Sequence, residues 1–210
     1  MSQVLIDRLR ARFGDGLLES GTFRGDEWVV LSPAVWYDAA IFLRDDPACE
    51  MSMFIDITAV DYPEREARFE LVLHLYSLHK QHRLRVKTRL FEEEEGKVDP
   101  ARPSRVPSLC DVYLGTNWFE REVWDMFGIR FDGHPDLRRI LLYPEFEGHP
   151  LRKDYDARKI QPLVPFREEA VGKLPPFLDD EGMSFGRNDL GDPSKAGREI
   201  AASSPSEEPS

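Results

Sequence analysis

Glu120 to Leu142 read EREVWDMFGIRFDGHPDLRRILL, and this stretch restricts the fold and the function more than any other part of the sequence. It sets acidic, basic, aromatic and turn-forming residues so closely together that a role beyond packing is indicated. The pattern predicts a short amphipathic helix that Asn117 caps, with Glu120 at its third position, and that Gly128 ends. Its expected apolar stripe is Phe119, Val123 and Phe127, and its expected polar face is Arg121, Glu122 and Asp125.

Two related turns follow this helix. The first contains His134-Pro135 and leads into the apolar run from Ile140 to Tyr143, for which we predict a short strand. The second, Gly148 to Tyr155, repeats the order Gly, His, Pro, Leu, Arg. Because proline fixes its own φ and biases the preceding residue toward extended geometry, each His-Pro pair should hold the residues after it in a defined direction.

Charged and titratable side chains are concentrated in these turns. The cations that they present are Arg138, Arg139, Arg152 and Lys153. Arginine suits bidentate capture of carboxylates across an interface, and a buried arginine needs a partner chain or internal acids to complete it. For His134 and His149 we expect hydrogen bonds to nearby backbone or carboxylate groups, or partner contacts, in preference to a proton-transfer role.

Taken together, these residues resemble the C subunit of proton-translocating NADH:quinone oxidoreductase, respiratory complex I. The resemblance covers Glu120 to Leu142 and Glu147 to Tyr155, and extends more loosely to the segment from Asp56 to Tyr62, so that it spans roughly residues 20–155. The signature and interface residues that it indicates are Glu120, Arg121, Glu122, Asp125, Gly128, His134, Pro135, Arg138, Arg139, Gly148, His149, Pro150, Arg152, Lys153 and Asp154.

The resemblance implies a structural subunit without a redox centre. Such a subunit lies in the peripheral arm at the cytoplasmic face of the bacterial inner membrane, packs chiefly against the D subunit of the quinone site and neighbouring iron–sulfur subunits, and reaches the membrane only through the complex. FMN and iron–sulfur clusters belong to partner subunits, and the whole complex passes electrons from NADH to quinone and couples this to proton translocation. Accordingly, we expect no catalytic, cofactor-binding or metal-binding residues in this chain.

Other readings stay open at this point. The alternative within the same group of complexes is the equivalent subunit of a membrane-bound hydrogenase or of an organellar photosynthetic-type dehydrogenase. A stand-alone enzyme would need a nucleophile, an acid–base pair or a cofactor loop, and no motif supports one. A free interaction module with several unrelated partners is a third class.

Composition excludes several classes. With 28 basic and 39 acidic residues the net charge is -11, which argues against nucleic acid as a partner. The two cysteines, Cys49 and Cys110, are expected to be reduced thiols, because they lack the spacing of a standard zinc or iron–sulfur site. The N-terminus has no signal-peptide pattern, and no apolar run of 18 residues occurs, so we expect a cytoplasmic chain.

The rest of the pattern predicts an α+β fold, a mixed sheet with flanking helices. We expect helices over residues 3–13 and from Pro33 to about Asp45, the latter capped by Ser32, and a further short helix opening at Ser108. Strands are expected over residues 28–31, 53–60, 69–78 and 83–90, the last two forming a hairpin. We divide the chain into an α+β domain (1–156), an extended partner-wrapping arm (157–181) and a disordered tail (182–210).

The hairpin carries two further candidate features. Alternation in its second strand places Arg83, Arg85, Lys87 and Arg89 on one face. That row is either a solvated face offset by acids such as Glu70 or a surface that docks on an acidic partner. Its histidines, which are His74, His79 and His82, are not expected to converge on a metal.

Overall fold

Five strands form one mixed sheet in the order β1-β2-β5-β4-β3, and two short strands, β6 and β7, pair beside it. The computed structural model describes residues 3–93, 99 and 101–164. The elements are α1 (Gln3–Phe13), η1 (Gly14–Gly16), β1 (Leu17–Phe23), β2 (Asp26–Leu31), η2 (Pro33–Val35), α2 (Trp36–Asp45), β3 (Met53–Asp61), β4 (Phe69–Ser77), β5 (His82–Leu90), β6 (Arg105–Pro107), α3 (Thr116–Phe127) and β7 (Arg130–Asp132). The predicted α+β class with a mixed sheet is confirmed.

The sheet is mixed because one pairing is parallel. Strands β3, β4 and β5 form antiparallel neighbours, and β4 and β5 are the predicted hairpin. Strand β2 runs parallel to β5, with Val29 opposite Val86. The described part of β1 pairs only with β2, through a turn in which Arg24 and Gly25 have φ of 54° and 90°, the combination that a two-residue type I′ hairpin requires.

The sequence carried no strand prediction for β1, nor for the short strands β6 and β7. The side chains of β1 are half-buried or exposed along its whole length, so no alternation of apolar residues marks it. Gly21 allows the Trp28 ring of β2 to lie against the β1 backbone, since a Cβ at Gly21 would lie 2.6 Å from that ring. The place of β1 in the sheet therefore rests on its backbone pairing with β2 and on this contact with the Trp28 ring.

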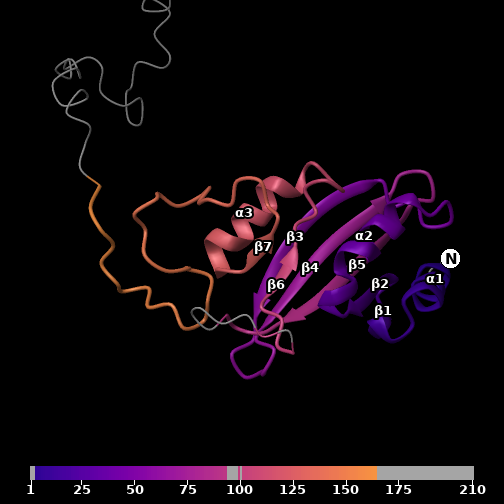
Figure 1. Cartoon of the computed structure of the whole chain (residues 1–210), viewed down its shortest axis with the longest axis horizontal. Coiled ribbons are helices and arrows are strands. Elements are labelled where there is room, and N and C mark those ends of the chain that lie inside the picture. Colours follow the sequence, from indigo (N-terminus) through magenta and orange to yellow (C-terminus); the bar gives the residue numbers. More distant parts are fainter. Residues whose placement is uncertain (1–2, 94–98, 100, 165–210) are drawn as a thin grey trace, which may run out of the picture. The chain divides into compact units, whose positions relative to one another are not determined.

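Helices cover the apolar side of the sheet at one end and flank its edge at the other (Figure 1). Leu5 and Leu9 of α1, and Trp36 and Leu43 of α2, are fully or almost fully buried in the core with the inward residues of β4 and β5. Helix α3 packs against β3, where the Phe54 and Phe119 rings meet edge to face with their centres 5.2 Å apart. This edge packing fixes α3 and the segment that follows it.

Two predicted details of the helices are wrong. Ser32 makes no side-chain cap, because the chain passes through the short helix η2 before α2 begins. The segment after Ser108 forms turns, since the Ser108 hydroxyl and the Leu109 N–H both bind the carboxylate of Glu120 and do not begin a helix.

The cationic row of β5 is confirmed as one face of the strand, and acids of β1, β2 and β4 pair with it. Lys87 Nζ lies 2.6 Å from Glu70, and Arg89 makes two hydrogen bonds to Glu19, at 2.7 and 2.8 Å. Arg83 lies 3.7 Å from Asp26. These contacts favour the reading of a solvated face offset by acids.

The hairpin histidines have separate surroundings. His82 Nε2 lies 2.9 Å from the carbonyl oxygen of Cys49, while His79 lies on the surface near Glu50. Burial lowers the pKa of His74 in β4. Among the residues that the structure describes, these three do not form a group that could hold a metal ion.

The described chain up to Leu163 belongs to one compact unit. The predicted domain boundary between residues 156 and 157 stays a prediction. The partner-wrapping role of the arm also stays a prediction for its described part, residues 157–164. Residues 165–181 of the arm and the tail (182–210) lie outside the described residues. No helix in the described ranges has the length and apolar character needed to span a bilayer.

Candidate functional site

The candidate site is built around α3 and the two His-Pro turns, which bind opposite ends of this helix. His134 Nε2 lies 3.2 Å from the carbonyl oxygen of Asn117 in the first turn of α3. At the other end, His149 Nδ1 donates to the carbonyl oxygen of Asp125 at 2.9 Å, and the Leu151 N–H donates to that of Met126 at 3.1 Å. Both histidines thus have the backbone hydrogen bonds that were expected of them.

Asp125 is the centre of this arrangement. Its side chain is fully buried and accepts backbone N–H bonds from Ile140, Leu141 and Leu142, at 3.1, 2.9 and 3.0 Å. Arg139 Nη1 donates to the other carboxylate oxygen at 2.6 Å. Although burial raises the pKa of Asp125, these donors outweigh it and hold the pKa below its usual value.

Two predictions fail at Asp125. Its place on a polar helix face is wrong, because the carboxylate points into the protein. The predicted strand over residues 140–143 is also wrong, because three successive N–H groups there bind this one carboxylate instead of a neighbouring strand.

Arg139 is the cation that pairs with Asp125, and its other acceptors also come from this chain. Its Nη2 donates to the carbonyl oxygens of Phe146 and Gly148 at 2.8 and 3.0 Å, and its guanidinium lies 5.7 Å from the Trp124 ring centre. Arg139 therefore joins α3 to both turns and has internal acceptors for its charge. Arg121 reinforces the same loop by donating to the carbonyl oxygens of residues 138 and 139, both at 3.1 Å.

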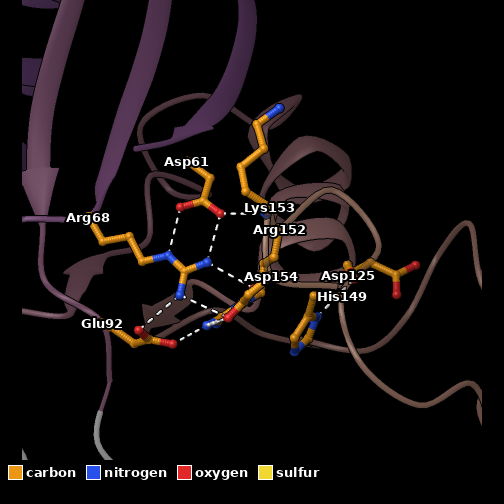
Figure 2. A network of polar contacts seen from close by, with 8 residues as sticks. All are labelled: Asp61, Arg68, Glu92, Asp125, His149, Arg152, Lys153 and Asp154. Atoms are coloured by element: carbon orange, nitrogen blue, oxygen red, sulfur yellow. Dashed lines mark hydrogen bonds and ion pairs between the residues drawn. The ribbon is translucent and has the colours of Figure 1, made fainter. Parts of the chain in front are cut away.

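A second charged network fastens the second turn to the sheet (Figure 2). Arg68, in the β3–β4 connection, makes a fork-like pair with Asp61 at the end of β3, at 2.7 and 2.8 Å. The Asp61 side chain is fully buried and also accepts the backbone N–H of Lys153 at 2.7 Å. Hydrogen bonding to Arg68 holds the pKa of Asp61 below its usual value, despite burial.

The outer part of this network is more exposed. Asp154 lies 2.9 Å from Arg68 and 3.2 Å from Arg152, and these two arginines lower the pKa of the Asp154 carboxyl, Arg68 more strongly. Glu92 accepts from both arginines, which Figure 2 shows as a closed set of contacts. Arg152 and Asp154 were predicted as site residues, whereas Arg68 and Glu92 were missed, because they come from separate segments with no motif of their own.

Glu120 is buried, and its predicted capping role is wrong. Helix α3 begins at Thr116, after Gly115, and no side chain caps it. The Glu120 carboxylate instead accepts from the Ser108 hydroxyl at 2.6 Å and the Leu109 N–H at 2.7 Å. Burial raises its pKa to about 7.

The remaining predicted site residues lie at the surface or in the turns. Glu122, Pro135, Arg138 and Lys153 are exposed, Pro150 is half-buried, and Gly148 takes a positive φ of 92°. Arg138 pairs only with the exposed Asp136 among the described side chains, at 2.8 Å. The structure thus divides the predicted set into residues that build the turns and residues that stay available to another molecule.

Gly128 ends α3 as predicted, and it lies against His149. Its φ is 82°, and a Cβ there would lie 2.8 Å from the His149 ring. We expect Gly128→Ala to lower the free energy of unfolding by about 2–4 kcal/mol, from left-handed backbone strain plus overpacking. Urea unfolding of the variant and the wild type measures this loss of stability.

Gly133→Ala provides the matched control. Gly133 has a similar φ of 80°, but a Cβ there would meet nothing within 4 Å. Only the backbone strain, about 1–2 kcal/mol, should appear in this variant. Equal losses in the two variants would show that the His149 contact with Gly128 contributes nothing.

Comparison with known families gives this geometry its context. The family model described as "Respiratory-chain NADH dehydrogenase, 30 Kd subunit" matches residues 29–161, which include the end of β2, α2, β3 to β7, α3 and both turns. The chain belongs to this family. The resemblance stated from Glu120 to Tyr155 is confirmed, and membership in the NADH dehydrogenase family favours that reading over the hydrogenase or photosynthetic-type alternative.

Relatives and a solved structure agree with the family. Relatives named as the C subunit of NADH-quinone oxidoreductase are 44% identical over 158 residues in Xanthobacter autotrophicus and 49% identical over 140 residues in Caulobacter vibrioides. These alignments cover 74% and 67% of this chain, and 71% and 66% of the relatives, so about two thirds of their length is matched. A chain of an archaeal respiratory complex, the membrane-bound sulfane sulfur reductase, has a TM-score of 0.59 at 26% identity, covering 74% of this chain and 86% of that one.

Proposed function

We propose that this chain is a structural subunit of the peripheral arm of an NADH:quinone oxidoreductase, with no redox centre of its own. The observation that carries the proposal is the pairing of charged residues that joins the two turns to α3 and to the sheet, with Asp125 bound to Arg139 and Asp61 to Arg68. Such pairing makes a rigid platform at one edge of the sheet. Rigidity of this kind suits a subunit that positions its neighbours.

The redox groups of the complex belong to other chains in this proposal. A cubane or binuclear iron–sulfur cluster needs four ligands, usually thiolates, and the sequence has two cysteines. The iron–sulfur clusters are therefore assigned to partner subunits, and the proposal places FMN there as well. Electron transfer from NADH to quinone, coupled to proton translocation, is the activity of the assembled complex at the cytoplasmic face of the membrane.

The surface of α3 supplies the proposed contacts to the D subunit of the quinone site and the neighbouring iron–sulfur subunits. Trp118 is 64% exposed, Leu114 just before the helix is 87% exposed, and Leu141 in the first turn region is 62% exposed. Arg121 lies 5.8 Å from the Trp118 ring centre and holds the loop that carries Arg138. Exposed aromatic and arginine side chains on a rigid support are typical of protein interfaces.

Native affinity purification of the tagged chain from gently solubilised host membranes tests the proposal. Mass spectrometry should identify a flavin- and iron–sulfur-containing assembly, and the eluate should show inhibitor-sensitive NADH:quinone activity. Recovery of the chain without these partners would contradict the proposal.

Trp118→Asp tests the proposed interface. We expect it to lower recovery of partner subunits by roughly tenfold or more, because a central aromatic anchor is replaced by a charge. Circular dichroism and urea unfolding of the isolated chain should change little, since the side chain is mostly exposed.

Phe23→Asp is the matched control. Phe23 has the same 64% exposure, but it lies in the β1–β2 hairpin. This hairpin is at the opposite edge of the sheet from β3, on which α3 packs. Its replacement should leave partner recovery unchanged. A loss of partners equal to that of the Trp118 variant would remove the assignment of the interface to α3.

A further inference from the structure

Cys110, Glu120 of α3 and His134 come together, although they belong to three separate segments of the chain. A ligand atom of each lies within 4.8 Å of the other two. Cys110 Sγ is 3.6 Å from a carboxylate oxygen of Glu120. Two ligands on a tetrahedral zinc ion, one sulfur and one oxygen, lie about 3.6 Å apart, given Zn–S near 2.3 Å and Zn–O near 2.1 Å.

Glu120 lacks a counter-charge. Its side chain is fully buried, and its polar contacts in the described chain are the Ser108 hydroxyl, the Leu109 N–H and the Cys110 thiol. By contrast, the buried carboxylates of Asp61 and Asp125 each have an arginine within 2.7 Å. A buried carboxylate without a cation is costly, so a positive ion at Glu120 would supply what the protein provides at the other two sites.

A hollow in the surface reaches Cys110, one member of this cluster. Cys110 and Ser108 line a hollow of about 680 Å³ whose wall also includes Asp38, Asp111 and Asp132. No lysine or arginine lines it among the described residues. The hollow is therefore an acidic approach that attracts cations toward Cys110.

We propose that Cys110, Glu120 and His134 bind a zinc ion. A thiolate, an imidazole and a carboxylate together suit zinc and disfavour calcium and magnesium, which prefer oxygen ligands. Three protein ligands leave a fourth position for water or for a group of a neighbouring chain. The ten- and fourteen-residue spacings along the sequence hide the site, which is why cysteine spacing alone predicted no metal.

His134 must exchange one hydrogen bond when the ion binds. Its Nε2 lies 3.2 Å from the Asn117 carbonyl oxygen, and its Nδ1 accepts the Asp136 N–H at 3.0 Å. Nδ1 gives up the Asp136 N–H for the ion, while the Nε2–H keeps donating to the Asn117 carbonyl oxygen and orients the ring, as is usual for zinc-bound histidines. His134 is half-buried next to the exposed Asp136, so this exchange involves a turn at the surface.

The test uses the purified full chain after treatment with a chelator. Titration with Co²⁺ should give a thiolate–Co²⁺ charge-transfer band that saturates at one equivalent, and Zn²⁺ should displace the Co²⁺ with an affinity of roughly micromolar or tighter. Cys110→Ala should abolish the band, and His134→Ala should weaken Zn²⁺ binding by tenfold or more. Unchanged binding in either variant would overturn the proposal. So would a wild-type absorption spectrum that does not change when Co²⁺ is added.

Two controls match the ligands by residue type. Cys49→Ala removes a fully buried thiol whose pKa burial raises to about 11, and His79→Ala removes an exposed turn histidine; both should keep the band. A measurement on the unaltered chain guards against variants that fail to fold. Zn²⁺ should slow alkylation of Cys110 several-fold, and equal rates with and without Zn²⁺ would overturn the proposal.

Discussion

Asp125→Ala is expected to lower the free energy of unfolding by about 3–5 kcal/mol, which is the range for breaking a buried ion pair by removing one partner. The change leaves the Arg139 guanidinium, 12% exposed, without its carboxylate. It also leaves the N–H groups of Ile140, Leu141 and Leu142 without an acceptor. Urea unfolding measures the loss, and hydrogen exchange of these three amides should accelerate first.

Glu122→Ala is the control for Asp125→Ala. Glu122 is an acid of the same helix, but it is exposed, so its removal should change the free energy of unfolding by no more than about 0.5 kcal/mol. Asp125→Asn adds a finer comparison, because the amide keeps the volume but loses the charge and one acceptor oxygen. Wild-type stability in Asp125→Ala would contradict the central role given to this carboxylate.

Asp125 also shows where sequence patterns reach their limit. It follows Arg121 by one helical turn, so periodicity places it on the same polar face. The groups that bury it lie 14 to 17 residues later, in a segment whose apolar run looks like a strand. A carboxylate that collects successive backbone N–H groups leaves no periodic trace, and its inward direction could be found only from the fold.

The elements that were predicted correctly have local causes. Gly128 ends α3 because the chain needs a positive φ there, and the β4–β5 hairpin follows from strict alternation along Leu84 to Leu90. The approximate bounds of α1 and α2 follow from their apolar spacing in the same way. Local rules of this kind are independent of partners distant in the sequence.

The family signature is thus a set of structural contacts to a large extent. In this chain its residues close the two turns on α3 and on the end of β3, through Asp125 and Asp61 respectively. An interface role is left to the exposed members, such as Glu122 and Arg138. If the exposed members contact partner subunits as proposed, a change in a buried member should disturb assembly indirectly, by altering the platform on which the exposed members lie.

Asp61→Asn is expected to lower the free energy of unfolding at neutral pH by about 2–4 kcal/mol, because Arg68 loses the charge of its fork-like partner in a buried position but keeps Glu92 and Asp154. The same change weakens the acceptor for the Lys153 N–H, so the second turn should detach from the sheet before the core unfolds. Urea unfolding measures the loss, and faster hydrogen exchange at Lys153 reports the detachment. Asp156→Asn, at an exposed acid in the same region, should stay within about 0.5 kcal/mol of the wild type.

The pH dependence of this loss distinguishes the ion pair from a packing effect. The pKa of Asp61 is lower in the folded protein than its unfolded value of about 3.9. Its stabilising contribution is therefore complete above roughly pH 5 and decreases as the pH falls through and below 4. Asparagine does not titrate, so the difference in unfolding free energy between wild type and Asp61→Asn should shrink in acid. A difference that stays constant from pH 7 to pH 3 would mean that Asp61 stabilises the turn by shape and not by its charge.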